Sequence, residues 1–161
     1  MSFIYTQDNF FERDTFKKIK LEIPTVEFNP PPKKIRDKQS TYWFEHKLPI
    51  LCEVQKLIYK NIELYFNKKV DVDVVTDTSC IYTMSNAKDH PRPHRDSIAT
   101  HQCLIYIKGD PHLANGTGFY TPDPKNELKF YLNLNVGFKE NRAIFFSSDN
   151  WHSSMQWSGE S

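Results

Sequence analysis

The residues best suited to chemistry are two histidines and one aspartate. His94 and Asp96 are two positions apart, so on an extended strand both side chains point to the same face. A second histidine, His152, follows 58 residues further along, shortly after the apolar run 143–146. If the chain folds back on itself, an imidazole, a carboxylate and a second imidazole can converge on one metal ion.

Two histidines and one carboxylate on one face of a metal leave its opposite face open to other ligands. This arrangement is typical of non-haem Fe(II) oxygenases. A His-x-Asp triplet alone is weak support, because most such triplets are polar surface residues. Here the triplet lies between a strand-like segment and a proline-rich loop, where ligands are often displayed. Trp151 stands beside the second histidine, and the segments between the two histidines read as strands.

The composition favours one compact domain and excludes several classes of function. The chain has 161 residues, 39% of them hydrophobic and 14% aromatic, which is enough for a core. A formal net charge of +1 gives no strong field for nucleic acid or an anionic membrane. Cys52, Cys80 and Cys103 are scattered without a paired spacing, which argues against disulfides and against a cysteine zinc site.

The N-terminal part of the sequence predicts helices, and the rest predicts strands. Apolar residues at helical spacing predict helices over 11–19 and 50–66, the second backing a sheet. Residues 115–118 predict a turn, and residues 29–34 a proline-stiffened loop. Alternating or continuous apolar patterns predict strands over 3–5, 70–74, 80–84, 102–107, 119–121, 129–136 and 143–146.

Helices followed by many short strands predict an α+β fold whose core is all β, closed as a sandwich or jelly roll. No repeat, low-complexity segment or domain boundary is visible, so we expect a single domain over 1–161. The first residues have no basic leader with an apolar run, and no stretch is long and apolar enough to span a bilayer. We therefore expect a soluble cytoplasmic protein.

At this point the sequence resembles the 2-oxoglutarate/Fe(II)-dependent oxygenases of the prolyl-hydroxylase-like group. Residues 80–96 resemble their strand, loop and His-x-Asp entry, and residues 104–107 with 116–120 resemble a strand followed by a glycine turn. Residues 141–152 resemble the approach to their distal histidine, and residues 3–19 resemble their opening strand and helix. The resemblance covers most of the chain.

The resemblance implies a double-stranded β-helix, a jelly-roll or cupin-like core with N-terminal helices packed on the sheet. Helical support would occupy roughly 1–69 and the β core roughly 70–161. It also implies that His94, Asp96 and His152 bind Fe(II), while 2-oxoglutarate and O2 take the three remaining positions. The implied function is a dioxygenase that hydroxylates a substrate and releases succinate and CO2, with cofactor and cosubstrate supplying the difficult chemistry.

One part of the family pattern is missing. These enzymes usually hold the far carboxylate of 2-oxoglutarate with an Arg or Lys on a final strand, about ten residues after the distal histidine. Here the sequence printed ends at Ser161, and we expect that a final core strand is missing. Arg142 or Lys129 is the alternative cation, and Tyr82 and Tyr106 are further candidates for contact with the cosubstrate.

Two other functions fit the same residues. One is a non-catalytic jelly-roll binding protein, and the other is a cupin-type hydrolase or isomerase in which the triad holds zinc or manganese.

The loops 85–93 and 110–116 are the expected rims for a substrate, which could be a protein or a small molecule. Arg95 lies between two ligands and is expected to point away from the metal, while Trp151 is expected at the rim or in the core.

Overall fold

The computed structural model describes residues 3–22, 42–44, 49–70, 82–84, 93–96, 100–109 and 115–155, with only the backbone for 42–44, 49–53 and 82–84. Two helices are present in these ranges, α1 (Arg13–Glu22) and α2 (Pro49–Phe66). The strands are β1 (Ile4–Gln7), β2 (Tyr42–Phe44), β3 (Tyr82–Met84), β4 (His101–Tyr106), β5 (Gly116–Asp123), β6 (Asn126–Gly137), β7 (Arg142–Ser147) and β8 (Trp151–Ser154).

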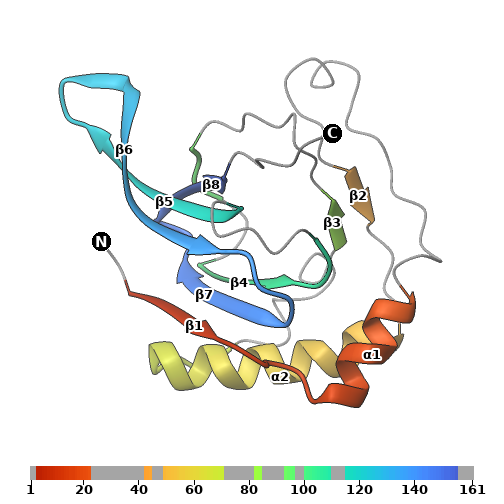
Figure 1. Cartoon of the computed structure of the whole chain (residues 1–161). Coiled ribbons are helices and arrows are strands. Elements are labelled where there is room, and N and C mark those ends of the chain that lie inside the picture. Colours follow the sequence, from red (N-terminus) through yellow and green to blue (C-terminus); the bar gives the residue numbers. More distant parts are fainter. Residues whose placement is uncertain are drawn as a thin grey trace.

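The strands form two three-stranded sheets and one short pair, all antiparallel. One sheet has the order β1-β7-β4, the other has the order β6-β5-β8, and β2 pairs with β3. Helix α2 runs beneath the β1-β7-β4 sheet, and the β5–β6 hairpin projects from the opposite side (Figure 1). The structure is thus mostly antiparallel β with few helices, as the strand-rich sequence predicts.

Strand β7 lies at the centre of the fold and is covered on both faces. Ala143 and Phe145 face the helices, while Ile144 and Phe146 face the second sheet, and none of the four is exposed. A strand buried on both faces reads as a continuous apolar run, which is why residues 143–146 are the clearest strand signal in the sequence. The core therefore has two layers, one on either side of β7.

Helix α2 supplies most of the layer beneath the sheet, as its helical spacing predicts. Val54 and Ile62 are buried against Phe145, with Leu57, Ile58 and Tyr65 packed around them. The predicted bounds of 50–66 agree with the observed helix to within one residue.

Helix α1 begins two residues later than predicted, at Arg13 rather than at 11. The backbone of Phe10 and Phe11 is held by the turn that precedes β7. The Phe10 amide donates to the Asn141 carbonyl (3.0 Å), the Phe11 amide donates to Asn141 Oδ1 (2.9 Å), and Asn141 Nδ2 donates to the Phe11 carbonyl (2.9 Å). These tertiary hydrogen bonds hold Phe10 and Phe11 outside the helix, so α1 begins at Arg13. The apolar spacing of the local sequence cannot reveal such hydrogen bonds.

The predicted turn at 115–118 is wrong, because Gly116 already begins β5. Gly116 has a φ of 134°, and a Cβ there would lie 2.1 Å from the Val136 carbonyl oxygen. Glycine is needed here because strands β5 and β6 come close together, and not because the chain reverses direction.

Strands β2 and β8 were not predicted, and the N-terminal part contributes β1 to a core sheet as well as helices.

Several expectations fall on residues outside the described ranges. They include the loop at 29–34, most of the strand at 70–74, and most of the loops at 85–93 and 110–116. Within the described residues, neither helix combines the length and the apolar character needed to cross a membrane.

Candidate metal centre

A backbone bridge joins His94 to His152. The His94 amide donates to the His152 carbonyl and the His152 amide donates to the His94 carbonyl, each at 2.9 Å. Two residues that exchange both hydrogen bonds are directly opposite in an antiparallel pair, so their side chains stand on the same side. The two imidazole ring centroids are accordingly 4.7 Å apart.

Asp96 completes the cluster from two residues beyond His94. Its Oδ1 lies 3.5 Å from His94 Nε2 and its Oδ2 lies 3.3 Å from His152 Nε2. One potential ligand atom from each residue lies within 4.8 Å of the other two. The structure thus brings together the three residues predicted as metal ligands, and their binding of a metal stays a prediction.

The three side chains differ in their surroundings. The His152 side chain is 8% exposed, whereas that of His94 is 51% exposed. Phe146 packs edge-on against the His152 ring at a centroid distance of 4.9 Å. His152 Nδ1 lies 3.0 Å from the Asn150 carbonyl oxygen. A carbonyl can only accept, so this contact places a proton on Nδ1 and leaves Nε2 as the ring nitrogen that faces Asp96.

Asp96 is held in its ionised form. The hydrogen bond from His152 is the largest cause that lowers the pKa of Asp96 to about 2, and a hydrogen bond from Gln102 adds to it against the opposing effect of burial. Gln102 Nε2 also donates to Ser148 Oγ (3.2 Å), which links β4 to the end of β7 beside the cluster. The sequence analysis missed Gln102 and Ser148. Gln102 is two residues before Leu104, and Ser148 is two residues after Phe146. Leu104 and Phe146 face the second sheet, so this spacing of two is the signal that could have identified Gln102 and Ser148.

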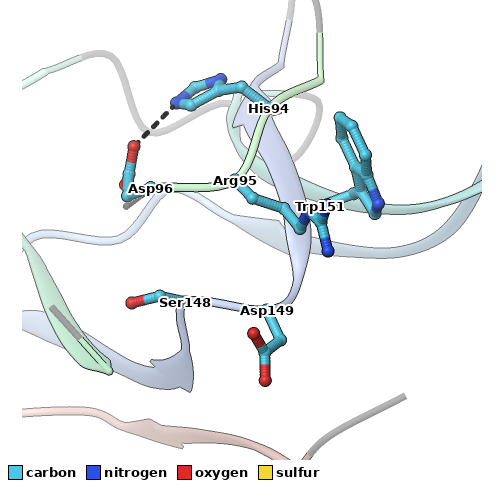
Figure 2. Close-up of a pocket in the computed structure, with 6 residues that line it drawn as sticks. All are labelled: His94, Arg95, Asp96, Ser148, Asp149 and Trp151. Atoms are coloured by element: carbon cyan, nitrogen blue, oxygen red, sulfur yellow. Dashed lines mark ion pairs between the residues drawn. The ribbon is translucent and has the colours of Figure 1, made fainter. Parts of the chain in front are cut away.

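An open pocket of about 450 Å³ adjoins the cluster. Arg95 extends away from His94 and Asp96 and runs alongside Trp151, as expected for a residue between two same-face neighbours (Figure 2). The Arg95 guanidinium carbon lies 4.8 Å from the centroid of the Trp151 ring, so Trp151 is a rim residue. The pocket is lined by His94, Arg95, Asp96, Ser148, Asp149 and Trp151.

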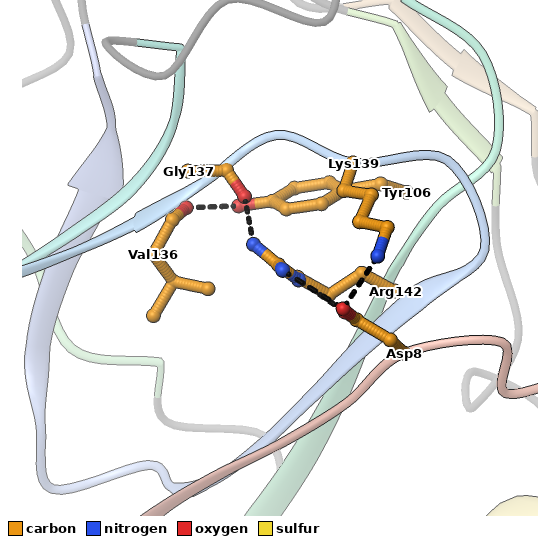
Figure 3. Close-up of polar contacts among 6 residues, drawn as sticks. All are labelled: Asp8, Tyr106, Val136, Gly137, Lys139 and Arg142. Atoms are coloured by element: carbon orange, nitrogen blue, oxygen red, sulfur yellow. Dashed lines mark hydrogen bonds and ion pairs between the residues drawn. The ribbon is translucent and has the colours of Figure 1, made fainter.

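Tyr106 and Arg142, two candidates for cosubstrate contact, belong to a different polar cluster. The Tyr106 hydroxyl lies 2.8 Å from Thr117 Oγ1 and donates to the Val136 carbonyl (3.1 Å). Arg142 donates to both Asp8 carboxylate oxygens (2.6 and 3.1 Å) and to the Gly137 carbonyl (2.8 Å), as Figure 3 shows. Burial raises the pKa of Tyr106 to about 12, so the phenol is neutral at physiological pH.

This second cluster lies at the other end of the sheet from the metal ligands. Tyr106 pairs with Arg142 at the start of β7, and Ser147 ends the strand beside the pocket residue Ser148. Ser147 is five residue steps along the strand from Arg142, which corresponds to about 17 Å. The structure therefore does not bring Tyr106 and Arg142 up to the histidines. The Tyr82 side chain lies outside the described residues, and Lys129 forms an ion pair with Asp123 (3.8 Å).

The comparisons with known proteins show a relationship of fold only. Neither a scan against protein-family models nor a search of curated proteins gives a match. Among solved structures, a Pseudomonas putida prolyl-4-hydroxylase matches with a TM-score of 0.61 and 13% sequence identity, over 97% of this chain and 86% of that chain. The fold of this chain is therefore related to that of a prolyl-4-hydroxylase, and the identity is too low to carry over the reaction.

Proposed function

We propose that this chain is an Fe(II)/2-oxoglutarate-dependent dioxygenase that hydroxylates a substrate with release of succinate and CO2. The observation that carries the proposal is the convergence of His94, Asp96 and His152 beside one pocket, on a fold related to that of a prolyl-4-hydroxylase. On this proposal the two sheets are the faces of a double-stranded β-helix, and the helices support one of them.

The three residues fit an octahedral metal. Metal bonds to imidazole nitrogen and carboxylate oxygen are about 2.0–2.2 Å long, so neighbouring octahedral ligands lie about 3 Å apart. The observed separations of 3.3 and 3.5 Å from Asp96 to the two imidazoles are close to this value. Two imidazoles with one ionised carboxylate are also the donor set of non-haem iron sites.

The roles of the residues follow from this geometry. His94, Asp96 and His152 would hold the iron, and the Asn150 carbonyl would keep the His152 ring oriented for it. Bound iron and 2-oxoglutarate would together supply the oxidising power for hydroxylation. The pocket beside the triad would receive the substrate and place its C–H bond next to the metal.

The anchor for the far carboxylate of 2-oxoglutarate stays a separate proposal. Tyr82, Tyr106 and Arg142 stay the predicted contacts, with Lys129 as the alternative cation. Of these, Tyr106 and Arg142 lie at the opposite end of the sheet from the histidines. Arg142 would have to exchange its ion pair with Asp8 to serve, since Asp8 occupies its guanidinium.

The decisive experiment is an anaerobic titration of the protein with Fe(II) and 2-oxoglutarate. We expect a visible charge-transfer band that is absent in His94→Ala and in His152→Ala. His101→Ala is the matched control, because this histidine packs against Phe66 and is not part of the cluster. Iron binding without the band, and without succinate on admission of oxygen, would contradict the proposal.

Two further measurements, of zinc binding and of hydrolysis, separate the alternative functions. Tight binding of zinc together with ester or lactone turnover would support a cupin-type hydrolase. A protein that binds no metal, and that tolerates Asp96→Ala without any change in behaviour, would be a non-catalytic binding protein.

A further inference from the structure

We propose that the pocket beside the metal ligands takes a small zwitterion of the free α-amino acid type. Its carboxylate would bind Arg95 and its ammonium group would bind Asp149. This inference rests on the proposed function, because it names the substrate class for the same site.

Arg95 is the arginine of the pocket, and its exposed side chain stacks on an aromatic ring. The guanidinium lies over the Trp151 ring at 4.8 Å, and Trp151 in turn packs against Phe130 at a centroid distance of 5.0 Å. Within the described part of the chain no acceptor contacts the guanidinium. Its planar set of N–H donors therefore remains available and matches the geometry of a carboxylate.

Asp149 is the second charge of the pocket, and among the described residues its carboxylate has no hydrogen-bond or ion-pair partner. Both the Asn150 amide and Asn150 Nδ2 donate to the Ser147 carbonyl at 3.0 Å. The Asp149 carboxylate itself is exposed and contacts no donor among the residues that the structure describes. The turn thus presents a carboxylate to the pocket without neutralising it.

Elsewhere in the described residues, several opposite charges form ion pairs. Asp8 binds both Arg142 and Lys139, and Lys20 binds Glu140 at 2.6 Å. Arg95 and Asp149 line one pocket, yet they form no ion pair with each other. The gap between them is the feature that a ligand with two opposite charges would fill.

The charge pattern selects among ligand classes. A simple anion near Arg95 would also meet Asp149, and a simple cation near Asp149 would also meet Arg95. The interior of a peptide chain carries neither an α-carboxylate nor an α-ammonium group. A free amino acid carries both, and a pocket of about 450 Å³ is within the range that holds small molecules.

The experiment measures binding of the common L-amino acids to the full chain loaded anaerobically with Fe(II) and 2-oxoglutarate, by calorimetry and by perturbation of the charge-transfer band. The tightest binder is then compared with its carboxamide, which lacks the carboxylate, and with its N-acetyl derivative, which lacks the ammonium group. We expect either modification to weaken binding at least 10-fold.

Charge-neutralising variants assign each end of the ligand. Arg95→Gln should reduce the preference for the acid over the carboxamide to less than 2-fold, and Asp149→Asn should do the same for the free amine over the N-acetyl derivative. Lys125→Gln, an exposed charge change outside the pocket, should preserve both preferences. Unchanged thermal melting of the variants checks that each one folds.

Three results would overturn the inference: no amino acid binds, the modified derivatives bind as well as the parent, or both pocket variants keep both preferences. Tighter binding of peptides blocked at both ends would also overturn it. The proposed function fails independently, through absence of the charge-transfer band in the wild-type protein. Calorimetry on protein loaded with Fe(II) alone still tests the zwitterion site in that case.

Discussion

At the scale of single residues, His94 and His152 are equivalent in the metal cluster but not in the fold. Both offer Nε2 to the same point, yet His152 is buried against Phe146 and held by the Asn150 carbonyl, while His94 is half exposed. Ring packing and a buried hydrogen bond contribute to folding, and an exposed imidazole contributes little. Substitution of each histidine in turn should therefore distinguish the effect on metal binding from the effect on the stability of the fold.

We predict that, without metal, His152→Ala lowers the free energy of unfolding by about 2 kcal/mol, because a buried ring and its hydrogen bond are lost. His94→Ala should change it by less than about 0.5 kcal/mol, since alanine keeps the backbone bridge. Both substitutions should lower metal affinity more than about 100-fold, because each removes a ligand. Urea unfolding and competitive metal titration measure the two effects, and equal destabilisation by both variants would contradict the prediction.

Asp8 gives a prediction about pH. Its hydrogen bonds with Arg142 and then Lys139 hold the pKa of the Asp8 carboxyl well below its ordinary value of 3.8. Because the folded-state pKa is the lower one, the ion pairs stabilise the fold above about pH 4, and their contribution is lost as the pH falls towards the folded-state pKa.

We predict that Asp8→Asn lowers the free energy of unfolding by about 1 kcal/mol at pH 7, a small value because the Asp8 side chain is 36% exposed and solvent screens the pairs. The difference from wild type should shrink steadily below pH 4. Denaturant titrations across pH 2–7 would test this, and a difference that grows on acidification would refute it. Asp14→Asn, on the exposed start of α1, is the matched control.

At the scale of elements, the metal cluster depends on short strands with weak sequence signals. Strand β8 carries His152 and pairs with β5, where Phe119 stands opposite His152. The residue that follows β8 is also bonded to the start of β5, because the Met155 amide donates to the Gly116 carbonyl (2.8 Å). The position of His152 is thus coupled to the close approach of β5 and β6 at Gly116.

We predict that Gly116→Ala destabilises the fold by at least about 3 kcal/mol, because the new Cβ would lie 2.1 Å from a backbone oxygen at a φ of 134°. Gly109→Ala is the matched control, since its Cβ would meet only the Phe138 ring at 2.9 Å, and a side chain can move. Thermal unfolding compares the two variants. A Gly116→Ala protein as stable as Gly109→Ala would show that the strands can separate without cost.

At the scale of the whole molecule, the metal cluster joins segments that are far apart in sequence. His94 and Asp96 precede β4 of one sheet, while His152 lies in β8 of the other. The core between the sheets includes Phe119 and Phe146, which both contact the His152 ring. A metal bound to all three ligands would cross-link these segments and favour the folded state.

We predict that divalent metal at 100 times its dissociation constant raises the free energy of unfolding by about 2.7 kcal/mol. For a domain of this size that corresponds to a rise in melting temperature of about 5–10 °C. Scanning calorimetry with Co(II), with and without chelator, measures the shift. His94→Ala should keep the metal-free melting temperature and lose the shift, whereas a full shift in that variant would place the metal elsewhere.

The sequence by itself determined the features that depend on local spacing. The separation of two between His94 and Asp96 fixes them to one face, and helical spacing fixes the apolar face of α2. The apolar run at 143–146 identifies the central strand, because a strand buried on both faces needs no alternation. These patterns also supported the α+β prediction and the choice of His152 as the third member of the set.

Only the tertiary structure decided which distant groups meet. The two hydrogen bonds between His94 and His152 and the Asn141 contacts that delay α1 join residues far apart in the chain. The same is true of the Asp8 pair that occupies Arg142, and of the gap between Arg95 and Asp149. Strand pairing and side-chain packing fix these distances, and local residue patterns carry no information about them.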